Sequence, residues 1–285
     1  MITFYLAVIG LIGCSLLAVF SLACDWLDVS GALLLLVMGT AIFALSPVMA
    51  GYLALFFAMS YLVQGLKKYF RKAPSQVTAL TTGGQLADSD ERIAKSHARD
   101  GWQVVANCGP LLIALLWQQL DGGDPRLVYC QIAVIAGAAA DTWSSEIGVL
   151  SRRPPRSLLT GRPLAAGLSG GVSLLGTCAG IAAAGIIAAA WWLPNQLLFP
   201  QMTNGLTFWL PALCGFAATW IDSLLGATLQ QKYRCQICGR ITEKKQHHGA
   251  ATQKISGIIG FNNDTVNFFS GLLTLGLAYL WQVLF

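Results

Sequence analysis

Carboxylates near the end of a long apolar segment are the residues of this chain best suited to chemistry. Asp141 and Glu146 lie in AADTWSSEIG, residues 139–148, and Asp222 repeats the situation in a second apolar segment. An ionisable side chain inside a membrane is costly unless it faces a partner, an ion or water. These positions therefore predict a functional site. The alternative is that Asp141 and Asp222 only pair with Arg or Lys side chains or accept hydrogen bonds from neighbouring helices.

The composition indicates what kind of protein surrounds these acids. Of 285 residues, 55% are hydrophobic and 11% are charged, and the mean hydropathy is +0.61. These values exclude an ordinary soluble domain and predict an all-α, polytopic helical membrane bundle, with the whole chain 1–285 as one membrane domain. Apolar runs of about 20 residues, the length that crosses a bilayer, predict eight spans. They lie near residues 3–24, 29–46, 48–66, 102–120, 127–150, 169–193, 206–229 and 265–285.

The basic residues predict which loops face the cytosol. Of the 18 Lys and Arg residues, 17 lie in three polar segments, 67–99, 152–162 and 232–254. By the positive-inside rule, cytosolic loops are expected at 67–100, 151–166 and 230–260, with both termini outside. The basic residues thus serve topology and contacts with membrane lipids or phosphates. No basic stripe interleaved with aromatic residues occurs, so no nucleic-acid partner is expected. A faint similarity links the spans that carry AADTWSS and TWIDSLL, and a weak internal repeat is one interpretation of it.

This topology brings polar residues from five segments to the cytoplasmic membrane boundary. They are Asp141, Glu146, Asp222, Asn107, Asn263, Asp264, Asn267 and the segment Gly167–Ser173. Hard oxygen ligands of this kind suit Mg²⁺, which supplies the counter-charge that several carboxylates need.

Helical spacing separates the two acids of the fifth predicted span. At roughly 100° per residue, Glu146 lies about 140° round the helix from Asp141. Either Gly148 marks a local unwinding, or Asp141 holds an ion while Glu146 pairs with the basic loop that follows it. In the last span, Asp264 and Asn267 are three residues apart and share a face.

A glycine-rich turn that leads into a helix is a candidate phosphate site. It contains Gly167, Ser169, Gly170, Gly171 and Ser173, and Arg152, Arg156 and Arg162 precede it. Exposed N–H groups and the positive end of a helix dipole suit phosphate, and arginine binds phosphate in a fork. The alternative is that the glycines permit tight helix packing and the arginines fix the topology. No G-x4-GK[ST] motif occurs.

A second candidate metal site lies in the last basic segment. Cys235 and Cys238 form a C-x2-C pair, and His247 and His248 follow. These four side chains suit a structural Zn²⁺. The alternative is a reduced cysteine pair with two solvated histidines. The other six cysteines lie in apolar segments, and no structural disulfide is expected.

Six segments in the same order also resemble a known family. They are KSHARDGWQVVANCG (95–109), AADTWSSEIG (139–148), GLSGGVSLLGTCAG (167–180), DSLLGATLQ (222–230), YRCQICGRITEKKQHHG (233–249) and NNDTVNFFS (262–270). They are similar to the DUF92 integral membrane family, which includes the transmembrane protein 19 group and the plant phytyl-phosphate kinases. The resemblance covers residue 28 to the end of the chain. Two residues differ from the family pattern. Cys108 stands where glycine is expected, and His248 stands where a cysteine often follows the histidine.

The resemblance implies an isoprenoid-phosphate kinase. CTP, or ATP, would donate its γ-phosphate to a prenyl monophosphate at the cytoplasmic membrane face. Asp141 and Asp222 would hold Mg²⁺, with Asp264 or Glu146 as a further ligand. The segment Gly167–Ser173 would bind nucleotide phosphates, and Arg152, Arg156 or Arg162 would offset developing charge. Asn107, Asn263 and Asn267 would orient oxygens through hydrogen bonds.

Two other classes of protein remain open on sequence grounds. A transporter or flippase of a lipid phosphate or small anion also places acids and a glycine break inside a bundle, although its site lies near the midplane and opens to both sides. A cytidylyltransferase acting on a lipid phosphate would use the same CTP and Mg²⁺ but release pyrophosphate. A purely structural subunit would not need so many intramembrane acids.

Overall fold

The protein is a helical membrane bundle, as its composition predicts. The computed structural model describes residues 1–72, 98–202 and 205–284. Six helices in this part of the chain are long and apolar enough to cross a membrane. They are α1 (Ile2–Ala23), α4 (Pro47–Lys72), α7 (Arg126–Gly148), α8 (Leu174–Leu198), α9 (Gly205–Thr228) and α10 (Asn263–Leu284).

The remaining two predicted spans also correspond to helical segments. One is α6 (Gly101–Leu120), and the other is a series of three short helices: α2 (Val29–Leu34), the π-helical turn Leu35–Gly39 and α3 (Thr40–Leu45). A short 3-10 turn, Pro200–Met202, follows α8. The predicted start of the first cytosolic loop at residue 67 falls within α4, which continues to Lys72, and residues 73–97 of that loop lie outside the described residues.

Polar side chains fix where several helices begin. Asp28, Asp100 and Ser173 each accept a hydrogen bond from the backbone N–H three residues later, at 2.8, 3.0 and 3.1 Å. Each bond satisfies one of the N–H groups that the first turn of a helix leaves unpaired. The sixth predicted span therefore starts later than expected, at Leu174 instead of residue 169, because Gly171 and Val172 pair as a strand before the Ser173 cap.

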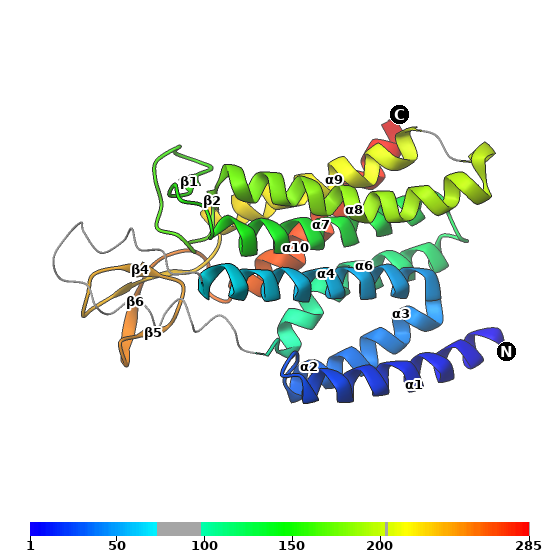
Figure 1. Ribbon diagram of the computed structural model, residues 1–285, viewed down its shortest axis with the longest axis horizontal. Helices are drawn as coiled ribbons and strands as arrows, with labels where there is room; N and C mark the ends of the chain where they lie inside the picture. Colours follow the sequence, from blue (N-terminus) through cyan, green and yellow to red (C-terminus); the bar gives the residue numbers. More distant parts are fainter. Residues whose placement is uncertain (73–97, 203–204, 285) are drawn as a thin grey trace.

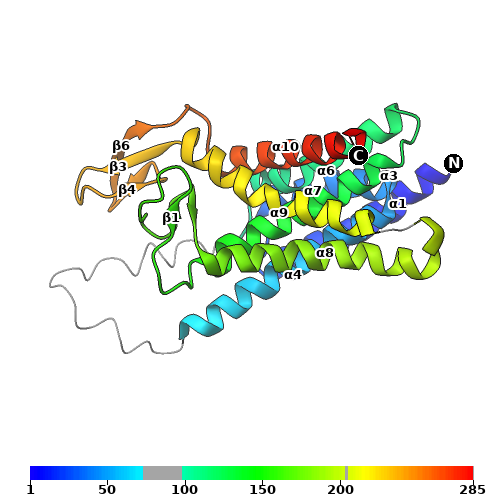
Figure 2. The ribbon, with the colours of Figure 1, turned by 90° about the horizontal axis from the view of Figure 1, so that it is seen from above.

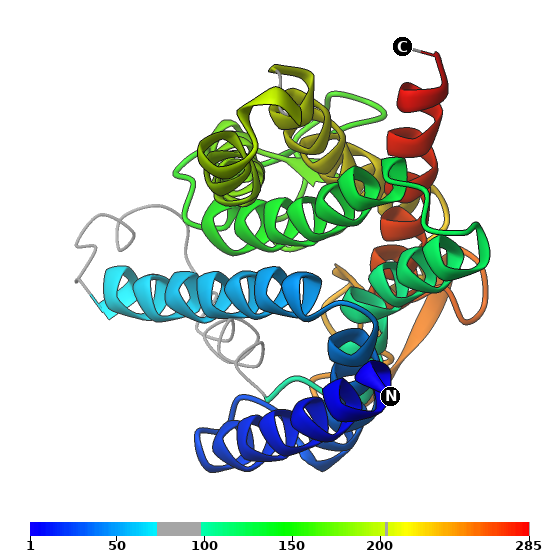
Figure 3. The ribbon, with the colours of Figure 1, turned by 90° about the vertical axis from the view of Figure 1, so that its right-hand side faces the viewer.

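Helix α7 lies at the centre of the bundle. It packs against α4, α6, α8, α9 and α10 (Figure 3). Eleven of its residues are buried, and most lie between Cys130 and Ala140, where alanine, glycine and branched aliphatic side chains alternate. Small side chains let neighbouring helices approach closely in a membrane. By contrast, α1 lies on the outside of the bundle, with much of its apolar surface exposed.

The two polar segments that the structure describes form small sheets at one end of the bundle. Strands β1 (Arg156–Ser157) and β2 (Gly171–Val172) pair antiparallel. The segment predicted as a loop at 230–260 contains a four-stranded sheet in the order β4-β3-β6-β5, built from β3 (Lys232–Cys235), β4 (Ile241–Thr242), β5 (Gln246–His247) and β6 (Ala250–Ser256). Both chain termini lie toward the opposite end (Figures 1 and 2).

Candidate functional site

The site begins with a close contact between α7 and α9. Both helices run toward the end of the bundle that carries the sheets (Figure 2). A Cβ added at Gly137 would lie only 2.8 Å from Ala218 Cβ, so the two helices touch at this pair. Asp141 and Asp222 each follow the contact by four residues, which is about one helical turn. Because the helices run in the same direction, both carboxylates lie at the same depth, and the two interact electrostatically.

Helix α10 adds hydrogen bonds to this pair. The Asn267 side-chain amide donates to Asp222 Oδ2 at 2.9 Å and to the Asn263 carbonyl at 3.2 Å. Ser270, three residues later on the same face, donates to the Asn267 carbonyl at 3.0 Å and also bonds to Asp222. Three helices thus bring two acids, an amide and a hydroxyl together.

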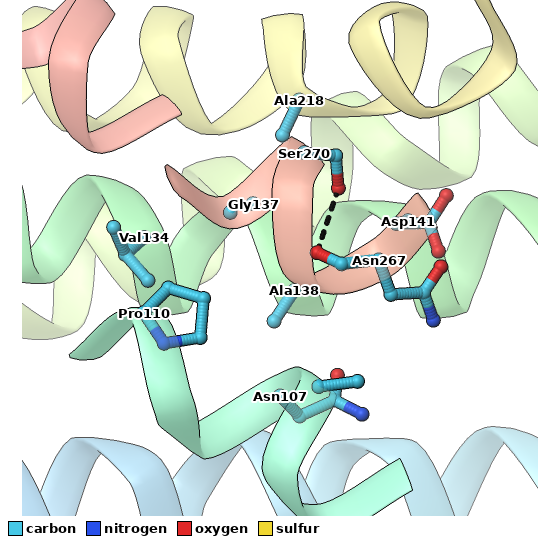
Figure 4. Close-up of a pocket in the computed structure, with 11 residues that line it drawn as sticks. Asn107, Pro110, Val134, Gly137, Ala138, Asp141, Ala218, Asn267 and Ser270 are labelled. Atoms are coloured by element: carbon cyan, nitrogen blue, oxygen red, sulfur yellow. Dashed lines mark hydrogen bonds between the residues drawn. The ribbon is translucent and has the colours of Figure 1, made fainter. Parts of the chain in front are cut away.

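A cleft opens beside Asp141. Helices α6, α7, α9 and α10 all contribute to its lining. Figure 4 shows the Asp141 carboxylate next to the Asn267 carboxamide, with Asn107 of α6 on the facing wall. The Asn107 amide donates to the Gln103 carbonyl at 2.7 Å, which leaves its side-chain oxygen as an acceptor. One carboxylate, two carboxamides and one hydroxyl therefore line a mostly apolar cleft between membrane helices.

The other two predicted acids lie around this centre in different surroundings. Asp264, half-buried in the first turn of α10, interacts electrostatically with Asp100. Glu146 interacts with Arg99, whose guanidinium also lies over the rings of Phe57 and Tyr61, at 5.7 and 5.4 Å from their centres. Pairing of Glu146 with the basic loop that follows it stays a prediction, and Arg99, just before α6, is an electrostatic partner that the sequence did not indicate.

The glycine-rich segment folds as a turn that rests on α9. Its strand β2 pairs with β1, so Val172 lies opposite Arg156. Gly170 has φ +86°, and a Cβ there would lie 2.6 Å from Ala227 Cβ, which explains why this position needs glycine. The Ser169 N–H donates to Glu243 Oε1 at 2.6 Å. The Glu243 carboxylate therefore accepts a hydrogen bond from a backbone N–H of the turn that the sequence predicts to bind phosphate.

The arginines of the basic loop lie on the outside of the same end. Arg152, Arg156 and Arg162 are exposed, and Arg156 donates to the Gly161 carbonyl at 3.2 Å. Gly167 is also exposed, with φ +92°. These side chains surround the glycine-rich turn rather than the Asp141 and Asp222 pair.

The cysteine segment brings three of its four predicted ligands together. The ligand atoms of Cys235, Cys238 and His247 all lie within 4.8 Å of one another. His248 is exposed and is not one of this group, because its backbone turns into the left-handed region at φ +55°. Hydrogen bonds to the Cys235 sulfur, first of all from the Cys238 N–H, lower the pKa of Cys235 to about 7.

Comparison with known proteins places the chain in a family. A model described as integral membrane protein DUF92 matches residues 12–275. The chain belongs to the DUF92 family. This DUF92 member is therefore an integral, multi-pass membrane protein.

Curated relatives share parts of this DUF92 chain. Protein PGR of Arabidopsis thaliana is 31% identical over 215 residues, which cover 68% of this chain and 73% of that protein. An uncharacterised membrane protein of Methanocaldococcus jannaschii is 35% identical over 127 residues, 43% of this chain and 48% of that protein. One of Synechocystis is 30% identical over 115 residues, 39% of this chain and 42% of that protein. No solved structure matches this DUF92 chain.

Several polar residues of the site escaped sequence reasoning. Ser270 follows Asn267 by three residues, and this helical spacing could have revealed it. Arg99 and Asp100 sit at the end of a basic segment, where they are indistinguishable from residues that set topology. Glu243 reaches Ser169 from 74 residues away, a contact that only the folded chain shows.

Proposed function

We propose that this protein is a membrane isoprenoid-phosphate kinase that converts a prenyl monophosphate into the prenyl diphosphate. One observation carries the proposal: Asp141 and Asp222 meet at one depth beside a cleft between membrane helices. Two neighbouring carboxylates repel each other, and their proximity is explained most simply by a cation that they share.

The donor atoms of the site fit Mg²⁺. Asp141 and Asp222 would hold the ion, with Asp264 or Glu146 as a further candidate, and carboxylate oxygens are the ligands that Mg²⁺ prefers. When bound, Mg²⁺ neutralises negative charge on the transferring phosphoryl group. The hydrogen bond from Asn267 fixes the orientation of the Asp222 carboxylate. Asn107 on the facing wall and Asn263 at the start of α10 would orient substrate oxygens.

For this reaction the protein mainly has to align the two substrates and neutralise their charge. An oxygen of the prenyl phosphate forms a bond to the γ-phosphorus of CTP or ATP. The bond between that phosphorus and the β,γ-bridging oxygen breaks, and CDP or ADP leaves with the electron pair. Because the prenyl phosphate is already an anion at neutral pH, no general base is required. The prenyl chain would lie between the membrane helices.

The nucleotide would approach from the end that carries the sheets. The turn Gly167–Ser173 rests on α9 one helical turn beyond Asp222, since Ser169 packs on Gly226. Nucleotide phosphates would take the position on the Ser169 N–H that Glu243 now occupies. Arg152, Arg156 and Arg162 would attract the phosphates from the surrounding loop.

This account requires the end with the sheets to face the cytosol. A reporter inserted after Gly161, at an exposed turn, should then report a cytoplasmic position, and one at the C-terminus an external position. The opposite result would remove the nucleotide from reach and contradict the proposal.

The decisive experiment compares two labels on the same nucleotide. Detergent-purified protein is incubated with Mg²⁺, a series of prenyl monophosphates, and CTP labelled at the γ- or the α-phosphorus, with γ-labelled ATP in parallel. The proposal predicts γ-label in a prenyl diphosphate. Transfer of the α-label would show a cytidylyltransferase instead. No transfer, combined with binding of the lipid phosphate, would favour the transporter.

A further inference from the structure

A second metal site lies in the small sheet, away from the carboxylate pair. We propose that Cys235, Cys238 and His247 bind one Zn²⁺. Their ligand atoms lie within 4.8 Å of one another, and Cys238 Sγ is 3.6 Å from His247 Nδ1. Cys235 and His247 are buried, whereas Cys238 is exposed, so the cluster has an inner and an outer side. This inference is independent of the proposed kinase activity.

The backbone between the two cysteines is already arranged around a sulfur ligand. The N–H groups of Ile237 and Cys238 approach Cys235 Sγ at 3.4 and 3.5 Å. The Gly239 N–H donates to the Cys235 carbonyl at 3.0 Å and closes the turn. Such N–H···S contacts stabilise a thiolate, the form of cysteine that binds a metal. Both thiols are free of any disulfide, and Cys238 Sγ contacts His247 Nδ1.

The ligand types select the metal. Two thiolates and an imidazole are soft and borderline ligands, which favour Zn²⁺ over the Mg²⁺ expected at the carboxylates. Zinc in such sites is tetrahedral. Water or His248 would supply a fourth ligand, since the exposed His248 ring lies 4.1 Å from the His247 ring.

The surroundings explain why the sheet would need a metal. Strands β4 and β5 have only two residues each, and few side chains of the sheet are buried, among them Tyr233 and Thr242. A core this small does not hold a fold unaided, and a metal site adds the missing stability. The ligands come from β3, the turn that follows it and β5, so one ion would join three parts of the sheet.

The metal would also position Glu243. This residue lies between β4 and β5, and its carboxylate accepts hydrogen bonds from the Ser169 N–H at 2.6 Å and from Gln230 Nε2 at 2.7 Å. The sheet thereby connects to the glycine-rich turn. The proposed role of zinc is structural: it fixes the sheet so that Glu243 reaches that turn.

Metal content of the full-length protein tests the proposal. Protein purified without chelator is expected to contain about one zinc per chain, because such sites bind zinc tightly at neutral pH. Cys235→Ser, Cys238→Ser and His247→Ala should each lower the zinc content at least about tenfold. Cys178→Ser, which removes an exposed cysteine of α8, is the matched control and should keep its zinc. Equal zinc in the control and in Cys235→Ser would overturn the proposal.

A spectroscopic measurement on the unaltered protein avoids any dependence on how the variants fold. The zinc K-edge absorption spectrum should contain a sulfur shell of two atoms. A spectrum with only oxygen and nitrogen neighbours, or the isolation of a metal-free protein with a Cys235–Cys238 disulfide, would contradict the proposal.

Discussion

The two ends of helix α7 carry acidic side chains in opposite circumstances. Just before the helix, Asp124 lies 2.9 Å from the Arg126 guanidinium and also accepts the Arg126 backbone N–H at 2.9 Å. Near its other end, Asp141 lies within electrostatic reach of a second acid, Asp222. The first arrangement needs only residues two apart in sequence. The second is assembled by α7, α9 and α10 and places two carboxyl groups side by side inside the membrane bundle, which is why we propose the functional site at this end.

Neutralising the acids should have the largest effect. Asp141→Asn and Asp222→Asn preserve the size of the side chain but remove the charge that would hold the proposed metal. Each should lower kcat for phosphoryl transfer by about 100-fold or more, equivalent to about 2.7 kcal/mol of transition-state stabilisation. Asp124→Asn is the matched control, since it keeps an oxygen for the Arg126 N–H, and should retain activity. If kcat fell by a similar factor in all three variants, the acids at the two ends of α7 would not differ in function, which would contradict the account.

Separating α7 from α9 should have the next largest effect. In Gly137→Ala the new methyl group meets Ala218, so the helices must move apart at an overpacked contact that costs about 1–3 kcal/mol. We expect a lower melting temperature in detergent and reduced activity, because Asp141 and Asp222 move apart.

The control for this change is Gly276→Ala in α10, where no atom lies within 4 Å of the added Cβ. It should leave the melting temperature unchanged or raise it slightly, because alanine favours helix. If Gly137→Ala behaved in the same way, the close contact would not position the acids.

A smaller effect is expected from Glu243→Gln. This change removes the negative charge on the Ser169 N–H that nucleotide phosphates would otherwise displace. The KM for the nucleotide should fall by about threefold to tenfold, up to about 1.4 kcal/mol, with kcat little changed. Steady-state kinetics over a range of nucleotide concentrations measure it, and a raised KM would contradict a phosphate site at this turn.

The smallest effect is expected at the opposite end, from Arg126→Ala. The hydrogen bond from Arg126 holds the pKa of Asp124 below its usual value. A carboxylate with a lowered pKa stabilises the folded state above the unfolded pKa of about 3.9, and this contribution is lost as acid protonates it. The variant should therefore melt slightly below the unaltered protein near neutral pH, and the difference should become smaller in acid, where only the loss of the contact between Arg126 and the Tyr279 ring remains. Activity should not change.

The sequence predicted the helices of the bundle and the candidate acids for a physical reason. Apolar length and rare intramembrane charge are local signals, so Asp141 and Asp222 stand out before any fold is known. What the sequence could not show is which side chains meet. Glu146 interacts electrostatically with Arg99 from a distant segment, and Glu243 reaches Ser169 across the chain. These contacts depend on how loops fold outside the membrane, where no periodic pattern constrains them.

In the cysteine segment, too, the sequence predicted the candidate residues but not which of them meet. The C-x2-C spacing and the histidine pair predicted four ligands. In the structure Cys235, Cys238 and His247 lie close together, and His248 lies outside this group. Two adjacent residues of a chain generally point in different directions, so a histidine pair rarely places both rings on one point. Spacing thus named candidate ligands, and the folded chain brings three of the four together, while His248 has a left-handed backbone and lies outside the group.

The most direct test of the account is divalent-cation binding by the carboxylate pair. Mn²⁺, which has the ligand preferences of Mg²⁺, can be titrated into detergent-purified protein and followed by electron paramagnetic resonance. The account predicts that binding by the unaltered protein is retained in Asp124→Asn and lost in the double variant Asp141→Asn, Asp222→Asn. Equal Mn²⁺ binding in the double variant and the unaltered protein would contradict the central claim that these two acids hold the metal.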